Sequence, residues 1–291
     1  MLLDAHQHFW RTDAAQYPWI PQGSALHRDW LPADLATLQR PLGLGGSIAV
    51  QARQSLAESD WLLGLADADP RVRAVVGWVD LRSPRVGEDL ARLARHPRFA
   101  GVRHVVQDEP DDRFLLGPEF LRGVALLPHF GLRYDLLIYP RQLPAAIEFV
   151  ARFPQLPIVL DHIAKPDIKA GALSPWREQI RELARAPHLL CKVSGLITEA
   201  DHATWSADDI RPYLDVIFEA FTPERLMWGS DWPVCLLAGS YERTFHLVKD
   251  YAAQFTSAQQ AALLGGNCAR FYLGSGEQRG GVKQSGGGLL E

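Results

Sequence analysis

Three histidines and one aspartate are the residues of this chain whose types and spacing best suit catalysis or metal binding. His6 and His8 stand two positions apart in the apolar opening stretch MLLDAHQHFW. His162 follows another apolar run, in LDHIAKP, and Asp231 follows a third, in MWGSDWPV. In a strand, residues i and i+2 project from the same face, about 7 Å apart. If they converge, three imidazoles and one carboxylate form a complete ligand set for one Zn²⁺ or a similar divalent ion.

A single histidine in a strand is usually a hydrogen-bonded core residue, so the chemical interpretation depends on convergence. Short apolar, β-branched runs alternate with helical patterns along the chain, which predicts a parallel sheet covered by helices. Eight such units in 291 residues favour a closed (β/α)8 TIM-like barrel over an open sheet, with 1–273 as a single domain.

The predicted elements follow this alternation. The predicted strands are 2–9, 46–51, 74–80, 100–106, 132–138, 157–163, 189–195 and 225–231. The predicted helices are 34–40, 58–68, 86–95, 118–130, 144–153, 175–186, 208–221 and 240–252, with an additional helix over 257–272. Residues 10–33 form an aromatic-rich insertion, which we interpret as a lid or wall of an active site; the alternative is a structural plug of the barrel mouth. The Gly-rich end, 274–291, predicts a disordered tail.

A barrel of this kind carries its chemistry at the carboxyl ends of its strands. The first, sixth and eighth predicted strands end with the three histidines and the aspartate, so these four side chains can converge there. Further polar or aromatic residues at or just beyond strand ends are candidates for substrate binding. These are Gln51, Arg103, His104, Lys165 and Trp232.

Three of these candidates have an alternative structural role. Arg103 could hold a substrate hydroxyl or carboxylate, or it could pair with Asp80 or Glu109. Lys165 could contact a ligand or lie on the surface. Trp232 could stack on a sugar ring or pack at the barrel rim.

Composition and motif content exclude several classes of function. A net charge of −4 gives no electrostatic basis for nucleic-acid binding. No apolar run is long enough for a transmembrane helix, and the start lacks the basic segment of a signal peptide. Three widely spaced cysteines, Cys191, Cys235 and Cys268, predict a reducing compartment, for which the cytoplasm is the default. No phosphate-binding glycine motif is present, so we expect no nucleotide cofactor. A homo-oligomer is compatible with the sequence.

Several segments together resemble the amidohydrolase-2 family, the sugar-lactonase-like branch of the amidohydrolase superfamily. They are DAHQHFW (4–10), LDHIAKP (160–166) and MWGSDWPV (227–234), with RHVVQ (103–107), KVSGL (192–196) and NCARFY (267–272) fitting as well. The resemblance covers 1–273. It implies a TIM-like barrel that hydrolyses small ring esters, such as aldono-1,4- or 1,5-lactones of the fucono-, rhamnono- or galactono- type. His6, His8, His162 and Asp231 match the family's site positions.

The chain departs from the binuclear members of this superfamily at one point. Those enzymes bridge two metals with a carboxylated lysine on strand four and use histidines on strands five and six. Here the fourth predicted strand offers Arg103 and His104, and the fifth offers no histidine. We therefore expect at most one divalent metal, with zinc as the best match for His6, His8, His162 and Asp231. Whether the site holds a metal and whether the reaction requires it are separate questions, because three imidazoles can also hydrogen-bond a substrate carbonyl directly.

For lactone hydrolysis we assign Asp231 as the general base for water. The histidines polarise the carbonyl, either through a metal or as donors to the developing oxyanion. The protonated Asp231 then passes its proton to the ring oxygen. Two other interpretations remain: a metal-dependent nonhydrolytic decarboxylase that uses the same four ligands, and a barrel that binds a small ligand without turnover.

Overall fold

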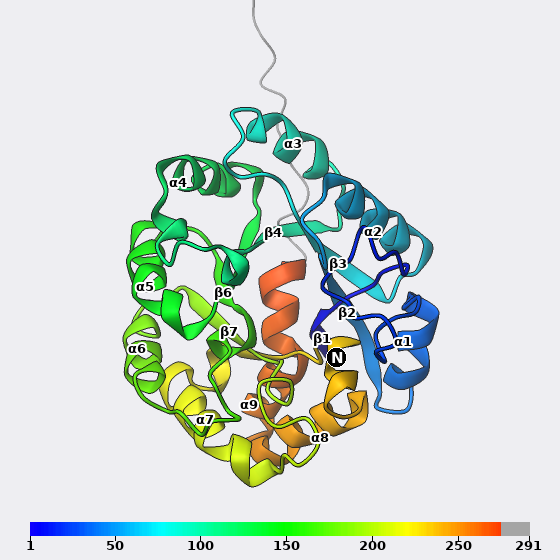
Figure 1. The fold of residues 1–291 in the computed structure, drawn as a ribbon, viewed down its shortest axis with the longest axis vertical. Helices are drawn as coiled ribbons and strands as arrows, with labels where there is room; N and C mark the ends of the chain where they lie inside the picture. The colour runs from blue at the N-terminus through cyan, green and yellow to red at the C-terminus, as the bar shows by residue number, and fades with distance from the viewer. Residues whose placement is uncertain (275–291) are drawn as a thin grey trace, which may run out of the picture.

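The computed structural model describes residues 1–274, and at its centre lies an eight-stranded parallel sheet in the order β1 to β8. The strands are β1 (Leu2–Gln7), β2 (Leu44–Val50), β3 (Val72–Gly77), β4 (Phe99–Val105), β5 (Arg133–Leu137), β6 (Ile158–Leu160), β7 (Leu189–Val193) and β8 (Leu226–Trp228). A parallel bridge between Gln7 and Trp232 joins the first strand to the segment after the last, and so closes the barrel. The predicted (β/α)8 barrel is therefore confirmed (Figure 1).

Helices form a ring around the barrel, one after each strand (Figure 1). They are α1 (Pro32–Gln39), α2 (Leu56–Ala68), α3 (Val86–Leu93), α4 (Pro118–Val124), α5 (Leu143–Arg152), α6 (Trp176–Leu183), α7 (Ala207–Phe221) and α8 (Tyr241–Ala252). The predicted single helix over 118–130 is divided, because Leu127–Phe130 forms a separate 3-10 turn that includes Pro128. Within the described residues, no helix has both the length and the apolar character needed to cross a membrane.

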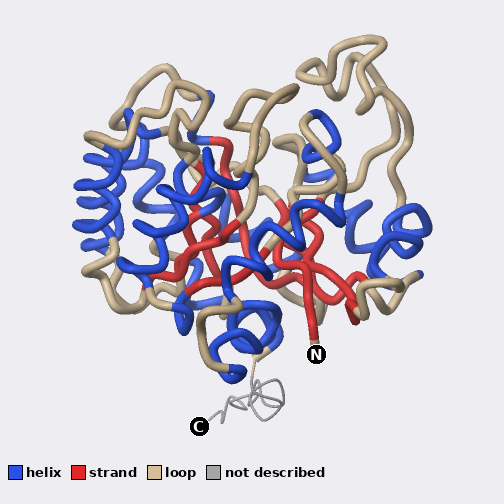
Figure 2. Tube along the Cα trace, turned by 90° about the horizontal axis from the view of Figure 1, so that it is seen from below, coloured by secondary structure: helices blue, strands red, loops and turns tan. Residues whose placement is uncertain are grey.

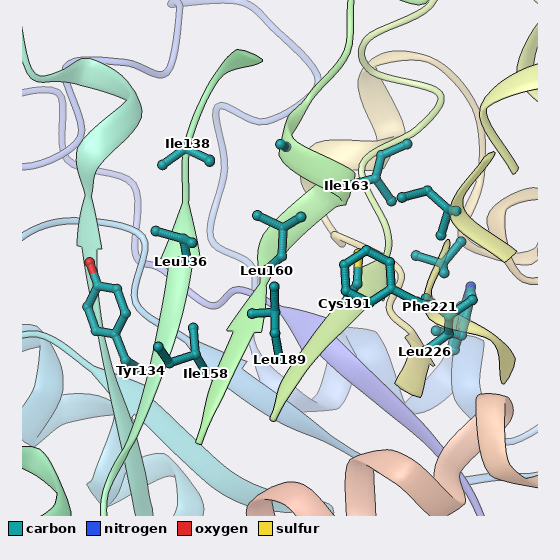
Figure 3. Close-up of a cluster of buried hydrophobic side chains, with 14 of the residues drawn as sticks. Tyr134, Leu136, Ile138, Ile158, Leu160, Ile163, Leu189, Cys191, Phe221 and Leu226 are labelled. Atoms are coloured by element: carbon teal, nitrogen blue, oxygen red, sulfur yellow. The ribbon is translucent and has the colours of Figure 1, made fainter. Parts of the chain in front are cut away.

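Most strand side chains that face the helices are apolar and buried. Figure 3 shows Leu136, Leu160 and Cys191 side by side on β5, β6 and β7, within one hydrophobic cluster. Each fully buried leucine contributes about 1.5–3 kcal/mol. Because side chains alternate along a strand, the residues next to these apolar ones point to the opposite side of the sheet. Because Leu136 and Cys191 face the helices, Asp135 and Lys192 face the barrel interior.

Strands six and eight are shorter than the sequence predicted. β6 ends at Leu160 and β8 at Trp228, whereas the predicted strands run to 163 and 231. Beyond β6 the four residues from His162 to Lys165 all have positive φ, and beyond β8 Asp231 has φ 55°. Left-handed backbone is unfavourable for residues with a Cβ, and it ends the hydrogen-bonded ladder. Both segments thereby turn into the mouth of the barrel.

The C-terminal helical segment covers the end of the barrel opposite the mouth. The predicted helix over 257–272 is interrupted: α9 (Ser257–Ala261) leads into π-helical turns at Ala262–Gly266 and Ala269–Leu273. Gly265 packs directly under the first strand, because a Cβ there would lie 2.3 Å from the carbonyl oxygen of Met1. Figure 2 shows the N-terminus and this segment at one end of the barrel, with long loops at the other. Residues 275–291 of the predicted tail lie outside the described residues.

Candidate active site

A cavity of about 760 Å³ opens at the mouth of the barrel, at the carboxyl ends of the strands. Five of its lining residues belong to the set predicted from the sequence: His8, Arg103, His162, Lys165 and Asp231. The remaining lining residues come mainly from the loops over 15–19, 52–55 and 105–109.

The three predicted histidines and Asp231 converge on one point. His6 Nε2 lies 3.2 Å from His8 Nε2. Asp231 Oδ1 lies 3.3 Å from His8 Nε2 and 3.9 Å from Nε2 of both His6 and His162. All four side chains are buried, with exposed fractions of 0 to 5% for the residues. Closing the barrel therefore brings together four groups that are far apart in the chain.

Three of these groups, His6, His8 and Asp231, have ligand atoms within 4.8 Å of one another and could hold one divalent metal ion, and a second such group consists of His6, Asp161 and His162. Tetrahedral zinc with bonds of about 2.0–2.2 Å places neighbouring donor atoms roughly 3.3–3.6 Å apart. The separations of 3.2 Å between His6 and His8 and 3.3 Å between His8 and Asp231 lie close to that range, whereas His6 and His162 each lie 3.9 Å from Asp231 Oδ1. Three imidazole nitrogens and one carboxylate oxygen also match the ligand preference of zinc.

Partners behind two of the rings fix their orientation. Nδ1 of His8 donates to the carbonyl oxygen of Val50 at 2.8 Å. A carbonyl only accepts, so in the neutral ring the His8 Nε2 faces the cluster without a proton. Nδ1 of His162 lies 2.9 Å from the hydroxyl of Ser194. Gly195 leaves room for that ring, because a Cβ there would lie 2.7 Å from His162 Nδ1.

Asp231 is a buried carboxylate that faces three imidazole rings. Its backbone N–H donates to the carbonyl oxygen of His6 at 2.8 Å. Burial opposes ionisation of Asp231, but the neighbouring His162 and His8 hold its pKa below the ordinary carboxyl value. Burial, aided by a nearby ammonium, holds the pKa of His6 well below its usual range, and burial also lowers that of His162. Asp231 therefore favours its ionised form, and His6 and His162 favour their neutral forms.

Asp4 holds the segment that carries Asp231 against the first strand. Its Oδ1 accepts from the Ser230 N–H at 2.9 Å, and its Oδ2 accepts from the hydroxyls of Ser230 at 2.6 Å and Tyr241 at 3.0 Å. Burial raises the pKa of Asp4 to about 6, although the bonds from Ser230 oppose this. The sequence analysis assigned no role to Asp4. The signal that could have found it is an acidic residue inside an otherwise apolar strand.

A second charged cluster, which we term the interior network, lies inside the barrel between the site and the C-terminal segment. Lys192 Nζ lies 2.5 Å from Asp135 Oδ2 and 3.0 Å from Asp161 Oδ1. Arg103 donates to Asp161 Oδ2 at 3.1 Å, and the Tyr272 hydroxyl donates to Asp135 Oδ2 at 2.7 Å. The sequence analysis assigned no role to the two aspartates or the lysine. A charge inside an apolar predicted strand was the signal that could have found Asp135 and Lys192.

Opposite charges stabilise the ionised forms within this network. Burial alone would raise the pKa of Asp161, but Lys192 and Arg103 lower it below the usual value. Burial alone would lower the pKa of Lys192, but the two aspartates raise it. Burial raises the pKa of Asp135 to about 6, against the influence of Lys192. Lys192 and Asp161 are therefore a buried ion pair at neutral pH.

Arg103 and His104 are neighbours on β4 and face different surroundings. Arg103 reaches the cavity and pairs with Asp161, which differs from both acids considered as its partners from the sequence. His104 lies outside the cavity lining: its ring stacks on Phe114 at 4.8 Å between centroids and bonds to Glu109 at 2.7 Å. The alternation of side chains along a strand explains why these two neighbours differ.

The other three substrate-binding candidates occupy different positions. Lys165 lines the cavity with its ammonium 3.6 Å from Glu199 Oε1. Trp232 is fully buried and packs edge-on against Trp30 at 5.1 Å between centroids, which corresponds to the rim-packing alternative. Gln51 is also fully buried, and its backbone carbonyl accepts from the Arg103 guanidinium.

The segment over 10–33 contributes both a packed base and an exposed wall. Its base is a buried apolar cluster of Trp10, Tyr17, Ile20 and Leu26. Glu58 anchors it, because the Tyr17 hydroxyl donates to Glu58 Oε1 at 3.0 Å. Trp19 is 43% exposed, lines the cavity and donates its indole N–H to the carbonyl oxygen of Ala52 at 3.1 Å.

Over nearly its whole length the chain is similar to known proteins. The Amidohydrolase family (Amidohydro_2) matches residues 3–273. An L-fucono-1,5-lactonase of Burkholderia multivorans is 47% identical over 93% of this chain and 95% of that protein. The L-fucono-1,5-lactonase of Burkholderia ambifaria is 39% identical, covering 93% of this chain and 94% of that protein. A crystal structure of a Burkholderia multivorans amidohydrolase with bound zinc is 46% identical, has a TM-score of 0.90, and is covered over 99% of its length by 94% of this chain.

Proposed function

The chain belongs to the amidohydrolase family, and on that premise we propose that it is a lactonase that hydrolyses a small sugar-acid lactone to the free acid. The observation that carries the proposal is Asp231 placed among three imidazoles beside an open cavity. Two curated relatives that bear the name L-fucono-1,5-lactonase support an aldono-lactone, such as L-fuconolactone, as the substrate.

Asp231 serves as the general base in this reaction. It lines the cavity, and its lowered pKa keeps it ionised at neutral pH. A carboxylate of low pKa is a weak base, so the substrate carbonyl must be strongly polarised for water to attack. After the attack, the protonated Asp231 gives its proton to the ring oxygen, and the leaving alkoxide stays tethered to the product.

The groups that polarise the carbonyl are not equivalent. Arg103 lines the cavity with a guanidinium, and His6 and His162 can each present an N–H. His8 in its neutral form has its proton committed to Val50, so it cannot act as the third donor to an oxyanion. This refines the expectation that the three histidines act alike. A well-placed donor contributes about 3 kcal/mol of transition-state stabilisation.

We propose zinc as the ion that His6, His8, His162 and Asp231 would hold. The donor types support this, and His6, His8 and Asp231 have ligand atoms close enough to share one ion, with His162 Nε2 3.9 Å from Asp231 Oδ1. The related amidohydrolase structure also contains zinc. When bound, such an ion supplies Lewis-acid polarisation of the carbonyl oxygen and lowers the pKa of a bound water. Metal analysis before and after chelation, with activity measured on the same samples, separates occupancy from requirement.

The two alternative functions have less support. A nonhydrolytic decarboxylase could use the same four ligands, but the relatives described above are named lactonases. A barrel that binds without turnover has no need of the carboxylate base beside the cavity.

The direct test is a pH-indicator assay over a panel of aldono-lactones that differ in hydroxyl stereochemistry. We expect hydrolysis of at least one, and binding of its product acid by Asp231→Asn with turnover largely lost. A folded wild-type protein that hydrolyses no lactone would contradict the proposal. Release of CO2 from an aromatic acid, strictly dependent on metal, would favour the decarboxylase.

We also propose a reducing, cytoplasmic location. The three cysteines, Cys191, Cys235 and Cys268, are free and buried. Burial raises the pKa of each thiol, so the thiols are poor nucleophiles and have no part in the proposed chemistry.

A further inference from the structure

The face of His6 that points away from the cluster meets a buried ammonium. Lys192 Nζ lies 3.2 Å from His6 Nδ1, and its other close neighbours are Asp135 Oδ2 at 2.5 Å and Asp161 Oδ1 at 3.0 Å. An ammonium has three protons and accepts none. That of Lys192 donates to Asp135 and is within hydrogen-bond distance of His6 Nδ1, whereas its contact with Asp161 is an ion pair. Lys192 is fully buried, so a proton that His6 did not accept would have no water to take it.

His6 also lies next to a second group that can only donate. Arg103 Nη1 is 3.2 Å from His6 Nε2. A neutral imidazole has one acceptor nitrogen, so only one of these two contacts can be a hydrogen bond. Arg103 has other partners: Nη1 donates to Asp161 Oδ2 at 3.1 Å, and the side chain lines the cavity, where an N–H can reach solvent or substrate. Lys192 lacks that access, so its bond to His6 is the one that must be kept.

His8 favours the same arrangement of protons. Its Nδ1 donates to Val50, so in the neutral ring its Nε2 presents a lone pair to His6 Nε2 at 3.2 Å. Two lone pairs facing each other at this distance repel unless a proton or a cation lies between them. A proton on His6 Nε2 removes the repulsion.

We propose that Lys192 is a positioning residue that selects the tautomer of His6. Donation from Lys192 to Nδ1 puts the imidazole proton on Nε2, where it bonds to His8 and is ready for a substrate carbonyl oxygen. Asp161 favours the other tautomer, because its Oδ1 lies 3.4 Å from His6 Nδ1 and can accept a proton there. In that tautomer the Nε2 lone pair is free for a metal. Lys192 thus favours the tautomer of His6 that donates a hydrogen bond from Nε2, and Asp161 favours the tautomer whose Nε2 can bind a metal.

The catalytic consequence of this selection rests on the proposed lactonase function, but the tautomer itself does not. Long-range ¹H–¹⁵N NMR of the chelator-treated wild-type protein, at one fixed neutral pH, reports directly on both ring nitrogens. A His6→Gln variant assigns the signals. We expect a protonated Nε2 and an unprotonated, hydrogen-bonded Nδ1. A proton on Nδ1 overturns the proposal, whether or not any lactone is hydrolysed.

Two variants are expected to shift the tautomer equilibrium of His6 in opposite directions. Lys192→Met keeps a side chain of similar length and removes the ammonium. We expect the His6 proton to move to Nδ1 and the affinity for zinc, measured by competition with a chromogenic chelator, to rise about 10- to 100-fold. Asp161→Asn removes the acceptor for that proton, and we expect the zinc affinity to fall by about the same factor.

Tyr272→Phe is the matched control, because it removes a hydroxyl that bonds to Asp135 on the far side of Lys192. We expect its tautomer and zinc affinity to stay within about twofold of wild type. In metal-free Lys192→Met, we expect kcat for an aldono-lactone to fall with little change in KM. A folded Lys192→Met variant with unchanged tautomer and zinc affinity overturns the proposal. If that variant does not fold, the wild-type NMR measurement decides.

Discussion

Two buried polar clusters lie next to each other in this barrel, and they differ in what surrounds them. At the mouth, Asp231 is 4% exposed and lies against a cavity of about 760 Å³. In the interior network, Lys192 is 0% exposed and is enclosed by protein. Burial therefore does not separate a reacting group from a supporting one. The distinction is whether a group can exchange its partner for substrate or can only hold the geometry of others.

The two clusters also differ in how their carboxylates are compensated. Asp161 lies between Lys192 and Arg103, so its charge is neutralised within the protein. Asp231 is surrounded mainly by imidazoles, whose pKa is held low by burial at His6 and His162. Its charge is therefore available to water or to a metal ion. Four changes test this contrast, beginning with the largest expected effect.

Asp231→Asn removes the proposed general base while preserving the shape of the mouth. We expect kcat for the best lactone to fall about 10³-fold, which lies within the range for loss of a general base. The thermal midpoint should change little, because the group borders a cavity. Asp80→Asn, which alters an acid at the end of the third predicted strand, is the control and should retain activity. Comparable activity in the Asp231→Asn variant would remove Asp231 from the mechanism.

Lys192→Ala tests the interior network, because it leaves the buried carboxylates of Asp135 and Asp161 without their shared ammonium. We expect a loss of about 3–5 kcal/mol in the free energy of unfolding, measured by urea denaturation. Arg85→Ala breaks an exposed pair with Glu88 and should leave the denaturation midpoint unchanged. Equal effects from the two variants would show that the interior network is not a structural support.

The compensation of Asp161 also predicts a pH dependence of stability. Its pKa is lower in the folded state than the usual 3.8, so the unfolded chain binds the proton more tightly. The stabilisation is complete above that value and is lost as pH falls through the folded pKa, by about 1.4 kcal/mol per unit of pKa difference. We expect Asp161→Asn to flatten the acid limb of the denaturation profile below pH ~4. An acid limb identical to that of wild type would contradict the assignment.

Trp19→Ala tests the outer wall of the cavity, where the smallest effect is expected. The indole is 43% exposed and borders the space above the cluster. We expect KM to rise about fivefold with kcat unchanged, because contact with the substrate is lost equally in the ground and transition states. Leu38→Ala, at another exposed apolar side chain, is the control. A fall in kcat without a change in KM would place Trp19 in the chemical step.

Periodicity was sufficient to predict the barrel, because both faces of each parallel strand are buried and each strand is followed by an amphipathic helix. It was less reliable at the ends of elements. The strands that end at Leu160 and Trp228 were predicted too long, since the apolar pattern continues into left-handed backbone. The helix predicted over 257–272 was divided, because Gly265 packs against the start of the chain.

Site prediction had the same limits. His6, His8, His162 and Asp231 were recognisable because each is a ligand type at the end of a predicted strand. Arg103 and His104 could not be separated, because adjacent strand residues face different ways and the facing depends on how the strand is packed. The partners of Lys192 come from two other strands, β1 and β5, and from the turn after β6, so no local pattern connects them.

The sequence alone determined the kinds of groups present and the regular alternation that arranges them. That was enough for the barrel and for four side chains that lie near one another, because strand ends meet at one rim in any barrel of this type. The tertiary structure alone decided which atoms face which. Whether His6 meets the ammonium of Lys192 or the carboxylate of Asp161 depends on packing over a few ångströms, between residues more than a hundred positions apart. Hydrogen bonds and ion pairs depend steeply on distance and direction, so the final chemistry of the site was set by the closed barrel.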